Sequence, residues 1–177
     1  MKREQKISQK IGGDPSEEMN TKCVDLSFSQ RDIRSLAFHL IYAMEQFDYT
    51  ISLEALVDNF RRGYDLDIPA DSPAIRIARL AIDKRNIFDE ELIPFLKNWK
   101  LERLGCCTRL ILRLSLSELS QPEAIPTVII NEAIELAKSF AERDAYKFVN
   151  GVLDEIIVAR GLKKKKSERV EDLLPIK

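Results

Sequence analysis

The last third of the chain constrains its fold most, because two apolar stripes recur there at helical spacing. The first stripe follows Pro126, whose fixed φ suits the first turn of a helix. The second follows Asp144, predicted as an N-cap that accepts hydrogen bonds from free backbone N–H groups. The apolar positions are Ile130, Ala133, Ile134, Ala137 and Phe140 in the first stretch, and Val149, Val152, Leu153, Ile156 and Ile157 in the second. This spacing predicts two consecutive amphipathic helices.

Polar residues and a glycine interrupt both predicted helices. Asn131 and Asn150 lie inside them, and Gly151 occupies a mid-helix position where it costs roughly 1 kcal/mol relative to alanine. Residues that cost helix stability need another reason to be present.

The same periodicity predicts five helices upstream, at about 29–47, 53–62, 74–85, 89–98 and 106–119. The last of these is apolar nearly all round, so it is predicted to be the central buried helix, with only Arg109, Arg113 and Glu118 breaking its surface. Six glycines and few alternating runs favour helices over strands. The predicted fold class is therefore all-α, with a disordered leader at 1–26, one helical domain at 27–160 and a basic flexible tail at 161–177.

The charge is unevenly distributed although the net charge is only −1. Residues 160–177 carry seven basic and three acidic side chains, including the run Lys163 to Lys166, whereas the middle of the chain is acidic. Such a tail is commonly a solvated, mobile segment. It could also be an auxiliary RNA-binding arm that supplies salt-sensitive contacts to phosphates.

Several function classes find no support in the sequence. No apolar run approaches the roughly 20 residues of a membrane span, and the polar start does not predict a secretory signal, so a cytoplasmic protein is expected. Three cysteines and the single histidine, His39, cannot complete a zinc site. No glycine-rich phosphate loop or catalytic triad is recognisable. We therefore expect no metal, no cofactor and no enzymatic activity.

Two arginines point to an anionic partner. Arg31 and Arg34 lie near the start of the first predicted helix, where the helix dipole prefers acidic side chains. Their presence against the dipole suggests phosphate contacts, although ordinary exposed arginines would look the same in sequence.

A second group of candidates opens the last predicted helix. Recognition of unstacked RNA requires cations for phosphates and planar groups for bases, and Lys147 and Phe148 supply one of each. Phe148 could equally be a core anchor, because it shares helical spacing with Val152 and Ile156. Asn150 offers a donor and an acceptor for a base edge, or for a contact between helices.

These segments resemble a known family. The stretches IPTVIINEAIELAKSF at 125–140 and KFVNGVLD at 147–154 resemble the closing motif of the NusB family of bacterial transcription antitermination factors. LGCCTRLILRLSLSEL at 104–119 resembles the helix before it, and RDIRSLAFHLIY at 31–42 resembles the opening helix. The similarity runs from about residue 30 to residue 154 in the family order.

The resemblance implies a seven-helix fold of two packed bundles, one from the first three helices and one from the last four. It also implies a single-stranded boxA-type leader RNA bound by Arg31, Arg34, Lys147 and Phe148, with Asp144 and Asn150 positioning that surface. The implied partners are NusE, a ribosomal protein that doubles as an elongation factor, and the RNA polymerase antitermination complex that transcribes ribosomal RNA.

Two alternatives remain open. NusB-like domains also precede ribosomal RNA cytosine methyltransferases, so the chain could be a subunit of such an enzyme. It could also be a protein-interaction module, for instance a homodimer, with weak or lost RNA binding, because Gln30 and Asp32 interrupt the arginine cluster that is usual in the opening helix.

Overall fold

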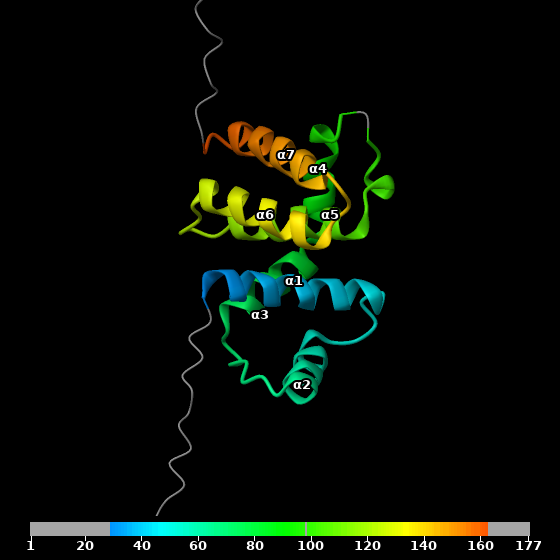
Figure 1. Ribbon diagram of the computed structural model, residues 1–177, viewed down its shortest axis with the longest axis vertical. Helices are drawn as coiled ribbons and strands as arrows, with labels where there is room; N and C mark the ends of the chain where they lie inside the picture. Colours follow the sequence, from blue (N-terminus) through cyan, green and yellow to red (C-terminus); the bar gives the residue numbers. More distant parts are fainter. Residues whose placement is uncertain (1–28, 98, 163–177) are drawn as a thin grey trace, which may run out of the picture.

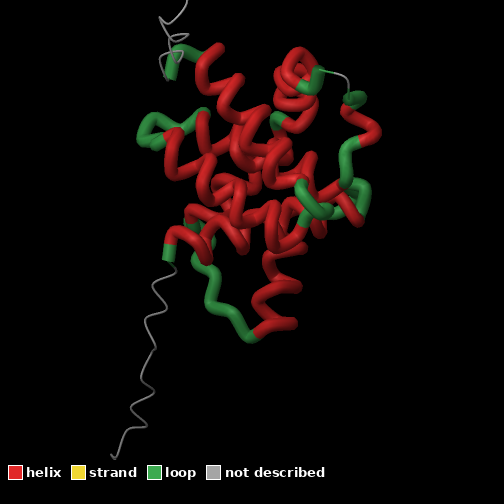
Figure 2. The backbone as a smooth tube through the Cα atoms, turned by 45° about the horizontal axis from the view of Figure 1, so that its top comes forward, coloured by secondary structure: helices red, strands yellow, loops and turns green. Residues whose placement is uncertain are grey.

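The computed structural model describes residues 29–97 and 99–162, and within them the chain is helical with no strand (Figures 1 and 2). The predicted leader at 1–26 and nearly all of the predicted tail lie outside the described residues. The elements are α1 (Gln30–Gln46), α2 (Leu53–Tyr64), α3 (Pro73–Asp83), α4 (Arg85–Leu92), the 3-10 turns η1 (Ile93–Phe95) and η2 (Leu101–Arg103), α5 (Cys106–Leu119), α6 (Pro126–Phe140) and α7 (Ala145–Ala159).

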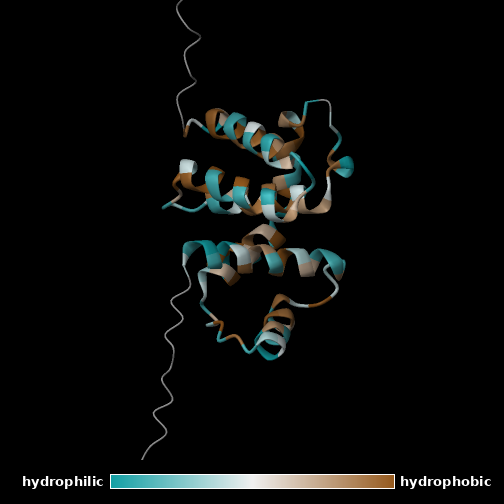
Figure 3. Ribbon diagram, in the orientation of Figure 1, coloured by the Kyte–Doolittle hydropathy of each residue, from teal (hydrophilic) through white to brown (hydrophobic). Residues whose placement is uncertain are grey.

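The helices form two packed groups, which confirms the predicted architecture. In Figure 1, α1, α2 and α3 lie in the lower half of the view, and α4, α6 and α7 lie in the upper half. Helix α5 belongs to the second group and packs against α1 and α3 as well as α6 and α7. Polar and apolar residues alternate along the helices (Figure 3), as expected for elements that each bury one face.

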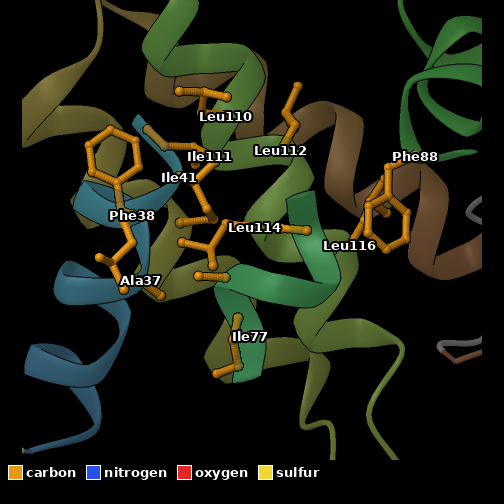
Figure 4. Packing of buried hydrophobic residues seen from close by; sticks show 14 of the residues in the cluster. Ala37, Phe38, Ile41, Ile77, Phe88, Leu110, Ile111, Leu112, Leu114 and Leu116 are labelled. Atoms are coloured by element: carbon orange, nitrogen blue, oxygen red, sulfur yellow. The ribbon is translucent and has the colours of Figure 1, made fainter. Parts of the chain in front are cut away.

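Helix α5 is the centre of the core, as predicted. Figure 4 shows its aliphatic side chains between those of neighbouring helices, including Phe38 and Ile41 of α1. The α5 residues Leu110, Ile111, Leu112, Leu114 and Leu116 are at most 1% exposed. One expectation for this helix was wrong: Arg113 and Glu118 do not break its surface but are buried, because acidic or basic partners on other helices pair with them.

Local signals explain where the first helix begins. Ser29 and Asp32 form a reciprocal capping box, in which the Asp32 backbone N–H donates to Ser29 Oγ and the Ser29 N–H donates to Asp32 Oδ2. Asp32 was interpreted from sequence as an interruption of an arginine cluster. Its position gives it a structural task, since it satisfies a free backbone donor at the helix start.

The fourth helix differs from the prediction of 89–98. It begins at Arg85, directly after α3, and ends at Leu92, followed by the 3-10 turn that contains Pro94. Proline has no N–H to donate and its ring clashes with the preceding turn, so the α-helix cannot continue through this position. Residues 96, 97 and 99–105, which the longer predicted helix would have partly covered, form irregular structure that includes η2 and leads into α5.

A cluster of charged side chains joins α1, α4 and α5, and we call it the bundle seam: Glu45, Tyr49, Asp89, Arg109 and Arg113. Arg113 holds Asp89 with two hydrogen bonds, from Nε at 2.7 Å and Nη2 at 2.6 Å, and it reaches Glu45 from Nη1 at 3.0 Å. Arg109 donates to the other oxygen of Glu45 at 2.6 Å. These pairs fix the orientation of α1 and α4 on the central helix.

Candidate RNA interface

The two arginines predicted to bind phosphate have different environments. The Arg31 side chain is 68% exposed and makes only a long contact, 3.4 Å from Nε to Glu132 of α6. The Arg34 side chain is 11% exposed and donates from Nε to Glu118 of α5 at 2.8 Å. The structure therefore leaves Arg31 available to an external anion, whereas Arg34 already pairs with a carboxylate of the protein.

Glu118 shows why the second pair is structural. Burial raises the pKa of this carboxyl group above its usual range, and the nearby Arg34 guanidinium only partly offsets the increase. A buried carboxylate of this kind depends on its partner, because removing that partner leaves an uncompensated charge. Arg34 thus connects α1 to the central helix.

The start of α7 is arranged differently from the prediction for Asp144. This residue does occupy the N-cap position, but its φ is 66° and its side chain makes no capping hydrogen bond. N-cap residues that accept from the first turn have extended backbone angles, whereas the left-handed conformation directs this side chain elsewhere. Asp144 Oδ1 instead lies 2.9 Å from Lys147 Nζ, and this hydrogen bond raises the pKa of the lysine.

Phe148 combines the two roles that the sequence left open. It is half-buried and packs against the core, yet its ring also contacts an exposed aromatic, Trp99, with centroids 6.2 Å apart in an edge-on arrangement. Asn150, two residues further along α7, is also half-buried. Its amide makes no hydrogen bond within the described part of the chain, so its donor and acceptor are available.

The turn between α6 and α7 is attached to the start of α5. Thr108 Oγ1 donates to Glu142 Oε2 at 2.7 Å. The Glu142 carboxylate also lies directly over Gly105, so closely that an added Cβ would meet Oε1 at 1.5 Å. Glycine at this position therefore makes room for the carboxylate, and the carboxylate fixes the turn that carries Asp144.

Sequence reasoning missed two clusters, an aromatic one between α1 and α6 and one of Tyr146 with two lysines at the start of α7. Phe140, at the end of α6, stacks on Phe38 at 5.0 Å and meets the His39 ring edge-on at 5.2 Å. Lys138 and Lys147 both lie with Nζ 5.7 Å from the ring of Tyr146. Helical periodicity assigned Phe140 to a core stripe, although it is partly exposed.

Phe140 faces α1, whereas the Tyr146 ring with its two lysines lies between α6 and α7. A groove between α1 and α6 is lined by Arg31, Ser139 and Phe140 together with two carboxylates, Glu132 and Glu135. Glu135 pairs with Lys138 at 2.7 Å. Arg31 and Phe140 therefore line one groove with acidic residues between them, whereas Lys138 and Lys147 flank the Tyr146 ring on α6 and α7.

Other chemistry is not evident in the described residues. They contain no group of three histidine, cysteine or acidic side chains that could hold a metal ion, and no helix among them is long and apolar enough to cross a membrane. Burial raises the pKa of the Cys106 and Cys107 thiols, which keeps them protonated and unreactive near neutral pH.

The chain is similar to known proteins along most of its length. Residues 31–158, which extend from α1 into α7, match the NusB family. The transcription antitermination protein NusB of Macrococcus caseolyticus is 39% identical over 129 residues, which cover 73% of this chain and 96% of that protein.

Solved structures also resemble this chain. NusB of T. maritima is 30% identical, with a TM-score of 0.63 over 73% of this chain and 90% of that chain. A chain in a structure of the antitermination factors NusB and NusE with double-stranded RNA is 24% identical, with a TM-score of 0.61 over 73% and 96% of the two chains. This second similarity shows a shared fold.

Proposed function

This chain belongs to the NusB family, and we propose that it binds boxA-type leader RNA together with NusE in the RNA polymerase antitermination complex that transcribes ribosomal RNA. Relatives are named as transcription antitermination proteins and not as enzymes, which agrees with a binding function and argues against a methyltransferase subunit. A factor of this kind would act in the cytoplasm.

The observation that supports the proposal most is that Arg31 is an exposed cation on an otherwise acidic protein. The body of the protein is acidic, so bulk charge does not attract RNA. Arg31 is nevertheless exposed beside a groove that the Phe140 ring also lines, and Lys147 is exposed beside the Tyr146 ring at the start of α7. Cations that contact phosphates and rings that stack on bases are what single-stranded RNA requires.

We assign the predicted residues the following roles. Arg31 and Lys147 contact phosphates, Phe148 contacts a base, and Asn150 offers hydrogen bonds to a base edge. Asp144 positions the Lys147 ammonium through their ion pair. Arg34 acts indirectly, because its bond to Glu118 holds the first helix and therefore Arg31 in place.

The test is a titration of the full chain, with and without NusE, against a boxA leader RNA and a scrambled RNA at two salt concentrations. Preferential binding to boxA that increases with NusE would support the proposal. Arg31→Glu should weaken binding and reduce its salt dependence, because each lost phosphate contact lowers the number of counterions released. The helical content should be unchanged.

Equal, weak binding to both RNAs would contradict the proposal and favour the protein-interaction alternative. Sedimentation of the free chain then becomes decisive, because a stable homodimer that buries Arg31 would explain why this exposed cation has no strong partner in the single chain.

A further inference from the structure

A cavity of about 420 Å³ lies beside the start of α7, and we call it the aromatic pocket. It is formed by the turn before η2, the start of α5 and the turn between α6 and α7. The lining residues used below are Trp99, Arg103, Thr108, Glu142, Arg143 and Phe148. Its volume falls in the range of small-molecule sites, so one nucleobase fits within it.

Trp99 is the unusual wall of this pocket. It is 57% exposed even though burial of so large an apolar side chain would stabilise the fold. The edge-on contact with Phe148 holds the indole, while much of its surface remains accessible. An aromatic ring that is held in place and exposed is suited to stacking with another planar group.

Basic side chains line the pocket together with the acidic side chains of Glu142 and Asp144. Arg103 and Arg143 line it, are exposed and make no ion pair within the described part of the chain. A second hollow of about 270 Å³ shares Trp99 and Phe148 as walls and is also lined by Lys97 and Lys147. The two rings therefore separate two hollows that each carry basic side chains.

We propose that the aromatic pocket takes one unstacked nucleobase of a single-stranded RNA, which stacks on Trp99, while Arg103 and Arg143 contact the phosphates beside it. This inference rests on the proposed function and adds a base-binding site that the sequence did not single out. It explains why an exposed tryptophan lies beside unpaired arginines next to the start of α7.

Trp99 is the only tryptophan in the chain, so its emission reports on this pocket alone. The experiment follows tryptophan fluorescence and the anisotropy of a labelled boxA leader RNA in the same titration of the full chain. We expect the RNA to quench the emission with the midpoint given by anisotropy. Trp99→Ala should weaken binding roughly 5- to 100-fold, the loss that corresponds to one base stacked on an aromatic ring.

Two further variants complete the test. Trp99→Phe should retain most of the affinity, because it keeps a stacking ring. Tyr64→Ala removes an aromatic that is 69% exposed on α2, away from the pocket, and should leave affinity unchanged. Circular dichroism establishes that each variant is folded.

The outcomes separate this inference from the proposed function. RNA that binds by anisotropy without changing the emission, and with equal affinity for Trp99→Ala, would overturn the pocket and leave the function intact. RNA that does not bind at all would overturn both. Emission that changes with NusE alone, and not with RNA, would assign the pocket to a protein partner and overturn it as a base site.

Discussion

Arg113 at the bundle seam and Arg143 at the aromatic pocket are chemically identical side chains in opposite situations. Arg113 is 7% exposed and bonded to the carboxylates of Asp89 and Glu45, whereas Arg143 is exposed and makes no ion pair with a described residue. Buried arginines must be paired because an isolated buried charge is too costly. An exposed arginine without an ion pair keeps its donors available to an external phosphate. The difference in burial and pairing therefore indicates a structural role for Arg113 and supports the binding role proposed for Arg143.

The strongest test of this division is Arg113→Met. The change leaves Asp89 without the guanidinium that pairs with it, while Glu45 keeps Arg109 and Tyr49, so we expect the free energy of unfolding to fall by about 3–5 kcal/mol. Urea denaturation measures the loss. RNA affinity, measured at a temperature where the variant is still folded, should not change. A loss of stability below about 1 kcal/mol would show that the seam is not an important structural element.

Arg34 and Arg31 provide the same comparison within one helix. Arg34→Ala should lower the free energy of unfolding by about 2 kcal/mol, because Glu118 stays buried and loses its hydrogen bond. Arg31→Ala should change stability by no more than about 0.5 kcal/mol. It should instead reduce the slope of log affinity against log salt by about 0.7, the value for one contact to single-stranded RNA.

Thermal or urea denaturation and RNA titration on both variants give the comparison directly. If Arg31→Ala were the destabilising change and Arg34→Ala the one that reduced the salt slope, the assignment of the two arginines would be reversed.

Features of the fold and of the candidate site could be predicted from the sequence where they depend on residues close together in the chain, and not where they depend on contacts between distant residues. Helical spacing located α5 and the α6–α7 pair, because an apolar stripe is a local pattern. It could not separate Arg31 from Arg34, since the partner of Arg34 lies 84 residues away. The left-handed backbone of Asp144 and the closeness of Gly105 to Glu142 also result from packing between distant segments.

The aromatic pocket was missed for the same reason. Trp99 follows the region of Pro94, where the helix predicted for 89–98 was extended too far, so the sequence pattern placed Trp99 just beyond a helix and gave it no partner. Its contact with Phe148 joins segments 49 residues apart. A lone tryptophan next to a proline-terminated helix was the available signal, and it did not identify a partner.

A smaller effect is expected from Gly105→Ala. The added Cβ would displace the Glu142 carboxylate and break its hydrogen bond to Thr108, at a cost of about 1 kcal/mol in stability. Because this carboxylate fixes the turn that carries Asp144, RNA affinity should fall several-fold as well. Gly63→Ala is the matched control, since nothing lies within 4 Å of its added Cβ.

The control should leave RNA affinity unchanged and stabilise α2 by about 0.5–1 kcal/mol, because alanine loses less conformational freedom than glycine in a helix. If Gly105→Ala binds RNA as well as Gly63→Ala does, the turn does not depend on Glu142 for its position.

The smallest expected effect is a difference in pH dependence between the buried Glu118 and the half-buried Glu45. Burial raises the pKa of Glu118, so its contribution to stability is fully present below the usual glutamate pKa and is lost as pH rises through the raised value. Burial also opposes ionisation of Glu45, but the Tyr49 hydroxyl and the guanidinium groups of Arg109 and Arg113 outweigh it and lower the pKa. The Glu45 contribution is therefore present above the usual pKa and is lost as pH falls.

Urea denaturation of the native chain, Glu118→Gln and Glu45→Gln across the acidic range tests these signs. The stability of the native chain relative to Glu118→Gln should decrease as pH rises above about 4.5, whereas relative to Glu45→Gln it should decrease as pH falls below that value. Opposite slopes would show that the several hydrogen bonds to Glu45 at the bundle seam outweigh the cost of burying its carboxylate. They would also show that the single bond from Arg34 does not outweigh that cost for Glu118. Two slopes of the same sign would contradict that difference between the two ion pairs.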